Sequence, residues 1–149
     1  HAYEDHHFVF INGEGHSEVP FGSYHTQVGL LPLFLHPNPE HVAIIGFGSG
    51  DTCFSASLHK ETKTVTCIEI IESQPKLLER HGQKTGYQPL NLLFTDPRIK
   101  IVSGDGRRYI ESCGRKFDII EADALRPFSS RAGMLYSKEY FEAMKNCLN

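Results

Sequence analysis

The chain has 149 residues, a formal net charge of −3 and 40% hydrophobic residues. That length suits one domain with a substantial buried core. The mild acidity argues against nucleic acid or an anionic membrane as a partner, and no apolar run reaches the roughly 18 residues of a membrane-spanning helix. Since the first residue is His1 and no secretory signal follows it, we expect an excised or processed piece of a protein.

The first 36 residues predict a short N-terminal β/helix extension. Residues 8–13 favour a strand that ends in the pair Asn12-Gly13, a strong hairpin signal. A glycine-rich connector is expected over 14–23. An apolar helix is expected over 28–35, where Pro32 indicates a kink or an early start.

From residue 37 onwards, strand and helix patterns alternate, which predicts parallel strands joined by right-handed crossovers. The segment 82–97, with its glycine and prolines, is expected to be looser. We therefore divide the chain into the extension, 1–36, and a Rossmann-like α/β nucleotide-binding domain, 37–149. The expected strands cover 42–47, 64–70, 99–105 and 117–123, and the expected helices cover 51–60, 73–81, a stretch from 106, and 137–148 capped by Ser137.

A glycine loop follows the first strand of this domain. The apolar run 42–45 leads into Gly46, Gly48 and Gly50, which let the backbone turn sharply and approach a ligand at a helix N-terminus. A dinucleotide fingerprint would need its third glycine at position 51, where this chain has Asp51. The pattern G-x-G-x-G is instead similar to the first motif of S-adenosylmethionine-binding domains. A tight turn that binds nothing is the structural alternative.

Acidic residues occur where the next strands end, at the sheet edge where open α/β sheets bind ligands. Glu69 lies about 20 residues beyond the glycines, the distance at which an acid meets ribose hydroxyls in both cofactor classes. Asp105, beside Gly106, suits an adenine amino group, or alternatively caps the following helix. Asp123 suits an amine whose proton it accepts, or alternatively forms an Asx turn. Asp118 is expected at the start of its strand, away from the site.

Cysteine and histidine spacing predicts neither a disulfide framework nor a metal site. The four cysteines, at positions 53, 67, 113 and 147, form no C-x-x-C pair. We therefore expect reduced, buried thiols in a cytoplasmic protein or in the soluble domain of a larger one. His6 and His7 cluster with Asp5 without zinc-site spacing, so we expect a solvated tail there and no bound metal.

Taken together, the motifs resemble those of the spermidine synthase (polyamine aminopropyltransferase) family over nearly the whole chain. A single glycine loop would be weak evidence, whereas an ordered set of motifs is more specific. The matching motifs are, in order, Tyr24-His25, the glycine loop, Glu69, the run from Asp96-Pro97-Arg98 to Gly104-Asp105, Phe117 to Asp123, and Leu135 to Phe141.

The resemblance implies a fold of the class I methyltransferase type and transfer of an aminopropyl group from decarboxylated S-adenosylmethionine to a small amine. That chemistry needs a neutral amine held against an electrophilic carbon, so positioning and a nearby carboxylate carry most of it. By the same resemblance, the donor is held by Gly46, Gly48, Ser49 and Gly50, its ribose by Glu69 and its adenine by Asp105 and Gly106, with Asp123 as base, Tyr24 as a further catalytic residue, and His25 and Arg126 on the substrate side.

Two positions depart from the family's pattern. Ser49 stands where members carry an acid that holds the aminopropyl end of the donor, and Arg126 stands where they carry a second acid before the proline. At ~5 Å and an effective dielectric constant of ~20, a cation there repels each polyamine charge by about 3 kcal/mol. We therefore do not expect putrescine as the acceptor. Arg126 suits a carboxylate, either on the acceptor or on intact S-adenosylmethionine.

Two other functions stay open: an S-adenosylmethionine-dependent methyltransferase on the same scaffold, and a non-catalytic nucleotide-binding module. The family's domain continues for several strands beyond the fourth, so we expect a C-terminally truncated fragment whose fourth strand has a free edge. A homo-oligomer formed through that edge is the expected assembly, unless the missing strands come from elsewhere.

Overall fold

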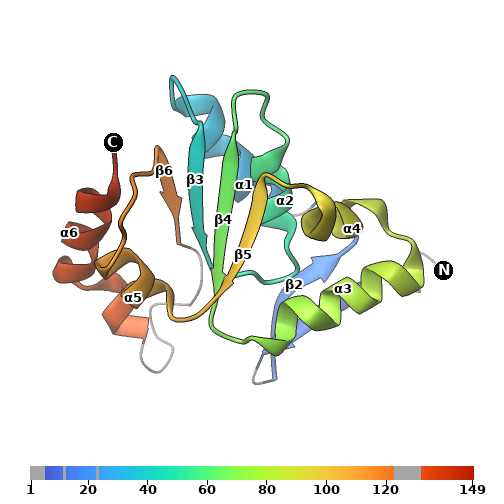
Figure 1. Cartoon of the computed structure of the whole chain (residues 1–149). Coiled ribbons are helices and arrows are strands. Elements are labelled where there is room, and N and C mark those ends of the chain that lie inside the picture. The colour runs from blue at the N-terminus through green and yellow to red at the C-terminus, as the bar shows by residue number, and fades with distance from the viewer. Residues whose placement is uncertain (1–5, 12, 23, 123–131) are drawn as a thin grey trace.

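The computed structural model of the chain describes residues 6–11, 13–22, 24–122 and 132–149. It combines an antiparallel hairpin with a four-stranded parallel sheet of strand order β5-β4-β3-β6 (Figure 1). The predicted α/β class with a Rossmann-like parallel sheet is confirmed. The strands are β1 (His7–Ile11), β2 (Glu14–Val19), β3 (His41–Ile45), β4 (Thr64–Glu69), β5 (Ile99–Ser103) and β6 (Ile119–Glu121), and the helices are α1 (Tyr24–Leu35), α2 (Asp51–Ser57), α3 (Ser73–Thr85), α4 (Gln88–Thr95), α5 (Gly106–Glu111), the 3₁₀ turn η1 (Ala132–Tyr136) and α6 (Lys138–Cys147).

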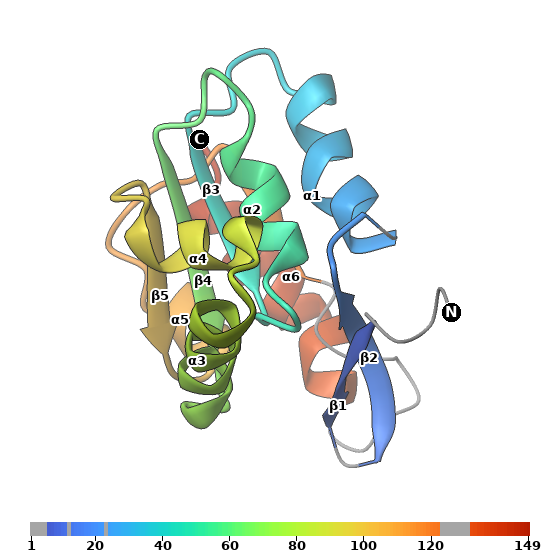
Figure 2. The ribbon, with the colours of Figure 1, turned by 90° about the vertical axis from the view of Figure 1, so that its right-hand side faces the viewer.

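Helices cover both faces of the parallel sheet, which gives three layers. Along β3, Val42 and Ile44 face a core shared with α1 to α4, whereas Ala43 and Ile45 face a second core shared with α5 and α6. Successive side chains of a strand point to opposite faces, and here both faces are buried, so β3 reads as one continuous apolar run. Figure 2 shows α2 between the sheet and α1.

The N-terminal extension forms the predicted hairpin but not the predicted connector. Strands β1 and β2 pair with Phe8 opposite Glu18, and Gly13 adopts φ +81° in the turn between them. Residues 14–19, expected to be a connector, form β2. Its sequence is poor in strand formers, so pairing with β1 rather than propensity makes it a strand. Helix α1 begins at Tyr24 instead of residue 28 and runs through Pro32. The domain boundary at 36/37 stays a prediction.

The segment 82–97, expected to be loose, is mostly helical. Helix α3 continues into it and ends at Gly86, whose φ of +71° is the left-handed conformation that favours glycine at a helix end. Helix α4 then carries Pro89 in its first turn, where a missing N–H removes no helical hydrogen bond. Leu90 and Leu93 are buried in the core beneath it.

The C-terminal helix begins as predicted, because the Ser137 hydroxyl accepts a hydrogen bond from the Tyr140 backbone N–H at 3.3 Å. Strand β6 lies at one end of the sheet order. Just before it, the Phe117 backbone bonds to Cys147 O at 2.8 Å and to Asn149 N at 2.9 Å, so the chain after α6 pairs alongside the same segment. The predicted homo-oligomer stays a prediction. No helix in the described part of the chain combines the length and apolar character needed to cross a membrane.

The expectation of four reduced cysteines is wrong for two of them. Cys113 and Cys147 form a disulfide, whereas Cys53 and Cys67 are free and buried. The bonded pair is 34 residues apart in sequence and meets only because α5 packs against α6. Linear spacing gives no sign of such a contact. The disulfide joins the ends of a segment that includes residues 123–131, which lie outside the described residues.

Candidate functional site

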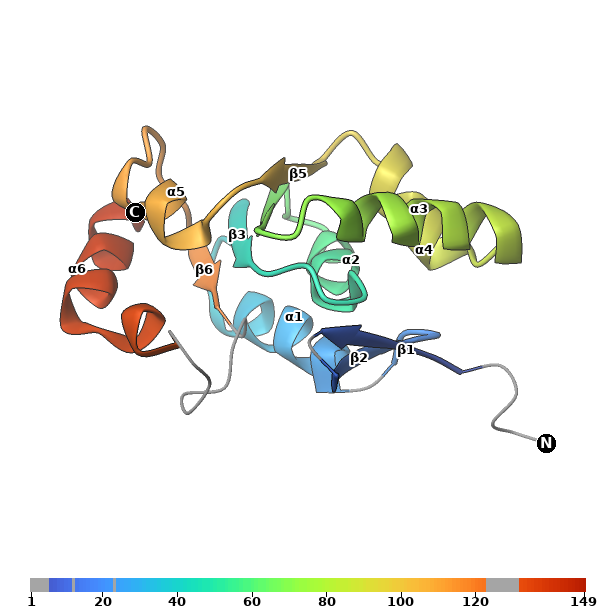
Figure 3. The same ribbon diagram turned by 90° about the horizontal axis from the view of Figure 1, so that it is seen from below.

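A cavity of about 680 Å³ opens at the carboxyl ends of the parallel strands; we call it the strand-end cavity. Figure 3, seen from below, looks onto this edge of the sheet. The size falls within the range of about 300–1,000 Å³ that is usual for small-molecule sites. It is lined by residues of five regions: the hairpin and α1 (Ile11, His16, His25), β3, the glycine loop and α2 (Ile44–Thr52 except Gly50), β4 and its exit (Ile68–Ile71), the start of α5 (Asp105–Arg107), and Glu121, Met134 and Leu135.

The glycine loop wraps one end of the cavity. Gly46, Gly48 and Gly50 have φ values of +97°, +55° and +91°, which explains why glycine stands at each position. Gly50 is also the N-cap of α2, and a Cβ there would collide with Leu93. Glycine is therefore required at position 50 by packing against Leu93, in addition to the backbone conformation of the loop.

Ser49 lies in the same loop with an unusual environment. Its side chain is 1% exposed and its hydroxyl has no hydrogen-bond partner within the described residues. The neighbouring Gly48 carbonyl accepts a bond of 2.6 Å from Gln74 Nε2 on α3. The loop backbone is thus anchored, whereas the Ser49 hydroxyl makes no hydrogen bond within the described residues. No local pattern indicates this position of Gln74, because its bond to the loop depends on how α3 packs against the loop.

Glu69 is held where β4 ends. Its side chain is 5% exposed, and its two oxygens accept bonds from Phe47 N at 2.8 Å and from Ile71 N at 2.6 Å. Each carboxylate oxygen has two lone pairs, so each retains one after its backbone bond. These bonds fix the carboxylate at the cavity wall in a geometry that can accept hydroxyl donors.

Asp105 caps helix α5, which is the structural role given above as the alternative to an adenine contact. Its Oδ1 accepts from Arg107 N at 2.8 Å and from Arg108 N at 3.3 Å, and neither bond uses Oδ2. The side chain is exposed and lines the cavity, so the adenine contact stays a prediction. Gly106 is buried, and a Cβ there would collide with Ile45, so this glycine lets α5 start close against β3.

Only one residue of the predicted Tyr24-His25 pair lines the cavity. Both residues begin α1, and their rings meet edge to face with centroids 5.5 Å apart. His25 lines the cavity, whereas Tyr24 is 61% exposed and lies outside the lining. The catalytic role of Tyr24 and the substrate role of His25 stay predictions.

Asp51 is a buried part of the cavity wall. In the sequence, this residue served only as an argument against a dinucleotide-binding site. Its carboxylate is 2% exposed. It accepts bonds from the Thr26 hydroxyl at 2.7 Å, the Ser55 hydroxyl at 2.9 Å and the Gly22 backbone N–H at 3.3 Å. These bonds tie the start of α1 to the start of α2. The carboxylate therefore positions the segment that carries His25.

The described cavity wall carries a surplus of negative charge. Four carboxylates line it, from Asp51, Glu69, Asp105 and Glu121, against one guanidinium, from Arg107. Arg107 is itself paired with Glu111 at 2.7 Å, on the same helix. A cation is therefore the kind of ligand that this wall favours.

Other predicted residues are absent from the described lining of the cavity. Asp123 and Arg126 fall among residues 123–131, outside the described part of the chain. Asp118 lies at the start of β6, as predicted, where its carboxylate accepts from His41 N at 2.7 Å. Asp96 forms an ion pair of 2.6 Å with Arg98, away from the cavity lining, and the hydrogen bond from that guanidinium lowers the pKa of the Asp96 carboxyl.

Comparison with known proteins identifies a family that this chain matches. The family model described as "Spermine/spermidine synthase domain" matches residues 22–149. The polyamine aminopropyltransferase of Methanocaldococcus jannaschii is 30% identical over 126 residues, covering 85% of this chain and 41% of its own length. The polyamine aminopropyltransferase 2 of Hyperthermus butylicus is 33% identical over 142 residues, covering 94% and 45%.

Solved structures agree with these relatives. A spermidine synthase in complex with the transition state analogue AdoDATO superposes with a TM-score of 0.74 at 29% identity, covering 93% of this chain and 46% of that one. The spermidine synthase from Thermotoga maritima gives a TM-score of 0.71 at 28% identity. The chain spans less than half the length of each of these relatives.

Proposed function

Because the chain belongs to the spermine/spermidine synthase family, we propose that its strand-end cavity binds an adenosyl sulfonium donor and that the protein transfers the aminopropyl group of this donor to a small amine. The aminopropyl donor is decarboxylated S-adenosylmethionine, because the intact compound carries a 3-amino-3-carboxypropyl group instead; intact S-adenosylmethionine is the alternative ligand of the cavity. A similar spermidine synthase has been solved in complex with the transition state analogue AdoDATO. This complex supports an adenosyl ligand in the cavity of this family.

The observation that carries the proposal is a buried carboxylate beside a glycine loop in a cavity of net negative charge. Glu69, already satisfied by two backbone N–H groups, presents its remaining lone pairs to the cavity and suits the ribose hydroxyls. The loop at Gly46–Gly50 allows close approach of the rest of the nucleoside. The surplus of carboxylates stabilises a sulfonium cation.

The reaction would follow from positioning. The nitrogen of the acceptor amine attacks the carbon next to the sulfonium, the new C–N bond forms as the C–S bond breaks, and methylthioadenosine leaves with the bonding electron pair. The attacking nitrogen then loses a proton to a carboxylate. Asp123 is our proposed base, and the proposal is supported by Glu121, two residues before it in the sequence, which lines the cavity.

Ser49 supports a second candidate donor, which differs from the first in the tail attached to the sulfonium. A neutral, unpartnered hydroxyl stands where the family pattern has an acid, so the loop lacks the anion that favours a donor carrying only an ammonium group. Intact S-adenosylmethionine, whose tail also carries a carboxylate, is tolerated better by such a loop. A methyltransferase on this scaffold is therefore the alternative function.

Calorimetric titration tests these proposals. Methylthioadenosine, S-adenosylmethionine and decarboxylated S-adenosylmethionine are titrated separately into the protein, and mixtures with amines are assayed for methylthioadenosine release. We expect methylthioadenosine to bind and a decarboxylated donor to release it in the presence of an amine. Methyl transfer from the intact donor, without methylthioadenosine release, would favour the alternative. No binding of any of the three compounds would overturn both functions.

A further inference from the structure

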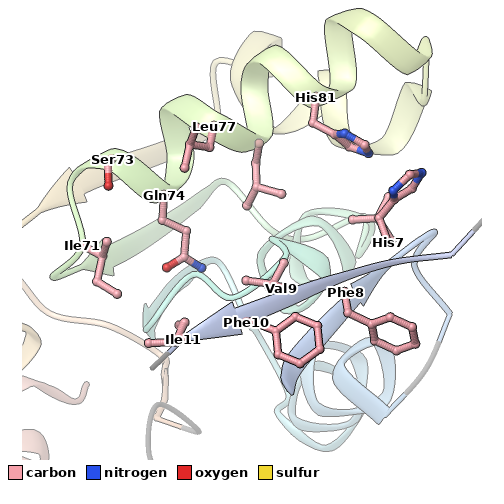
Figure 4. A pocket seen from close by; sticks show the side chains of 12 residues that line it. His7, Phe8, Val9, Phe10, Ile11, Ile71, Ser73, Gln74, Leu77 and His81 are labelled. Atoms are coloured by element: carbon pink, nitrogen blue, oxygen red, sulfur yellow. The ribbon is translucent and has the colours of Figure 1, made fainter. Parts of the chain in front are cut away.

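A second cavity, of about 550 Å³, lies between the hairpin and α3; we call it the hairpin cavity. Figure 4 shows His7, Val9 and Ile11 on the face of β1 that looks toward α3, while the rings of Phe8 and Phe10 turn to the opposite face. None of its lining residues is Asp, Glu, Lys or Arg. The full lining is His7, Phe8, Val9, Phe10, Ile11, Val19, Ile71, Ser73, Gln74, Leu77, Leu78 and His81.

Gln74 presents a hydrogen-bond acceptor at one end of this cavity. Its side chain is 6% exposed, and its Nε2 donates to the Gly48 carbonyl at 2.6 Å. That bond determines which atom is nitrogen, because an amide oxygen could not donate to a carbonyl. Its Oε1 is buried and has no partner within the described residues. A group that only accepts is thus left without a donor.

His81 provides a second unpaired atom at the other end. Its Nε2 is buried without a partner among the described residues, and its ring meets the His7 ring edge to face with centroids 4.6 Å apart. Figure 4 shows the two rings directed toward one another. Burial, with smaller contributions from His7 and Lys84, lowers the pKa of His81, which favours the neutral ring. The Nε2 of a neutral ring either donates or accepts, and a hydroxyl can meet both cases.

The spacing of these two atoms defines the shape of a ligand. Gln74 and His81 lie on the same helix, seven residues apart, so their Cα atoms are separated by roughly 10.5 Å along its axis. Between them the wall is aliphatic, from Ile11, Val9 and Leu78. A straight chain with a polar group at each end would cover this wall and reach both unpaired atoms.

We propose that the hairpin cavity is a second ligand site, which takes an uncharged, elongated aliphatic molecule with a hydroxyl or amide N–H donor at its ends. A buried polar group without a partner is unfavourable, so a ligand that supplies the partner gains affinity. A charged end would lose its water and find no counter-ion in the described wall. This site differs from the strand-end cavity in its chemistry and does not depend on the proposed transferase activity.

Ligand-observed NMR or calorimetry with a homologous series tests the proposal. The probes are 1-alkanols and α,ω-alkanediols of increasing length, with hexane-1,6-diamine as the charged analogue of hexane-1,6-diol. We expect the dissociation constant to fall about fourfold for each added methylene until the cavity is filled. We expect the diol to bind at least about tenfold more tightly than the diamine dication. No binding of any alcohol or diol, or equal binding of the diamine, would overturn the proposal.

A pair of variants locates the site. His81→Phe keeps an aromatic ring against His7 but removes the unpaired nitrogen, so the advantage of a diol over the 1-alkanol of equal length should disappear. His59→Phe, at a histidine that lines neither cavity, should leave that advantage unchanged. Retention of the diol's advantage in His81→Phe would overturn the proposed polar end. Methylthioadenosine binding, measured on the same samples, reports separately on folding and on the strand-end cavity.

Discussion

The two cavities share Ile11 and Ile71 in their walls but present opposite kinds of polar group. The strand-end cavity carries four carboxylates and one guanidinium within the described residues. The described lining of the hairpin cavity carries an amide, a hydroxyl and two imidazoles, without a carboxylate, an ammonium or a guanidinium group. Two binding chemistries are therefore built within a short distance of each other, separated by the glycine loop and Gln74.

The difference lies in how the polar groups are satisfied. In the strand-end cavity, Asp51, Glu69 and Asp105 each accept bonds from backbone N–H or hydroxyl groups, so their charge is stabilised without a counter-ion from a side chain. In the hairpin cavity, the acceptor of Gln74 and the Nε2 of His81 have no partner in the described structure. One cavity is prepared for a cation, whereas the other leaves neutral atoms that a ligand can complete.

The largest expected effect is a loss of stability on removal of Asp51, a carboxylate that holds the structure together, in contrast to Glu69, the carboxylate proposed to bind a ligand. Asp51→Ala removes the acceptor of the buried Ser55 hydroxyl, of the partly buried Thr26 hydroxyl and of the Gly22 N–H, so these donors lose their partner. We expect the free energy of unfolding to fall by about 3 kcal/mol in urea titration. Glu139→Ala, at an exposed position on α6, is the control and should change it by less than about 0.5 kcal/mol. A loss below about 1 kcal/mol for Asp51→Ala would mean that these bonds do not tie α1 to α2.

A smaller effect tests the proposed contact between Glu69 and a ribose in the strand-end cavity. Glu69→Gln places an NH₂ group where one carboxylate oxygen accepts a backbone bond, and it removes the charge. We expect methylthioadenosine to bind about 10- to 100-fold more weakly, since a hydrogen bond to a charged group contributes about 1.5–3 kcal/mol. Free adenine, which lacks ribose, should lose much less affinity in the same titration.

The control for that experiment is Glu72→Gln, on an exposed residue paired with Lys76 at 2.7 Å. Its affinity for methylthioadenosine should match that of the unmodified protein. If Glu69→Gln weakens adenine as much as methylthioadenosine, the carboxylate supports the shape of the cavity instead of binding the ribose.

The sequence predicted the strand-end cavity better than the hairpin cavity, for a physical reason. Gly46–Gly50, Glu69 and Asp105 follow three parallel strands, and the carboxyl ends of such strands meet at one edge, so local patterns were enough to bring them together. His7 and His81 meet across a contact between the hairpin and α3 that no local pattern encodes. His7 was accordingly expected in a solvated tail, although it lies in β1 and lines a cavity.

Other errors had signals that could have been read differently. Pro89 sits two residues after a tyrosine in a stretch rich in leucine, which is as compatible with the first turn of a helix as with a loop. The Thr26–Asp51 bond and the Cys113–Cys147 disulfide are different, because their partners are far apart in sequence and meet only through helix packing. The meeting of residues at the strand ends could be predicted, whereas contacts between helices could not.

The smallest expected effect concerns the neutral cavity and depends on pH. The pKa of His81 is lowered in the folded protein, first by burial, so below about pH 6.5 the unfolded chain binds a proton more readily there than the folded chain does. The free energy of unfolding should therefore decrease as the pH falls through that value, by less than about 1 kcal/mol from this residue. His81→Phe removes the contribution, so its melting temperature should drop less between pH 7.5 and pH 5.5 than that of His59→Phe, which keeps His81. Equal drops for the two variants would mean that His81 takes up its proton as easily in the folded chain as in the unfolded one, and that the hairpin cavity tolerates charge after all.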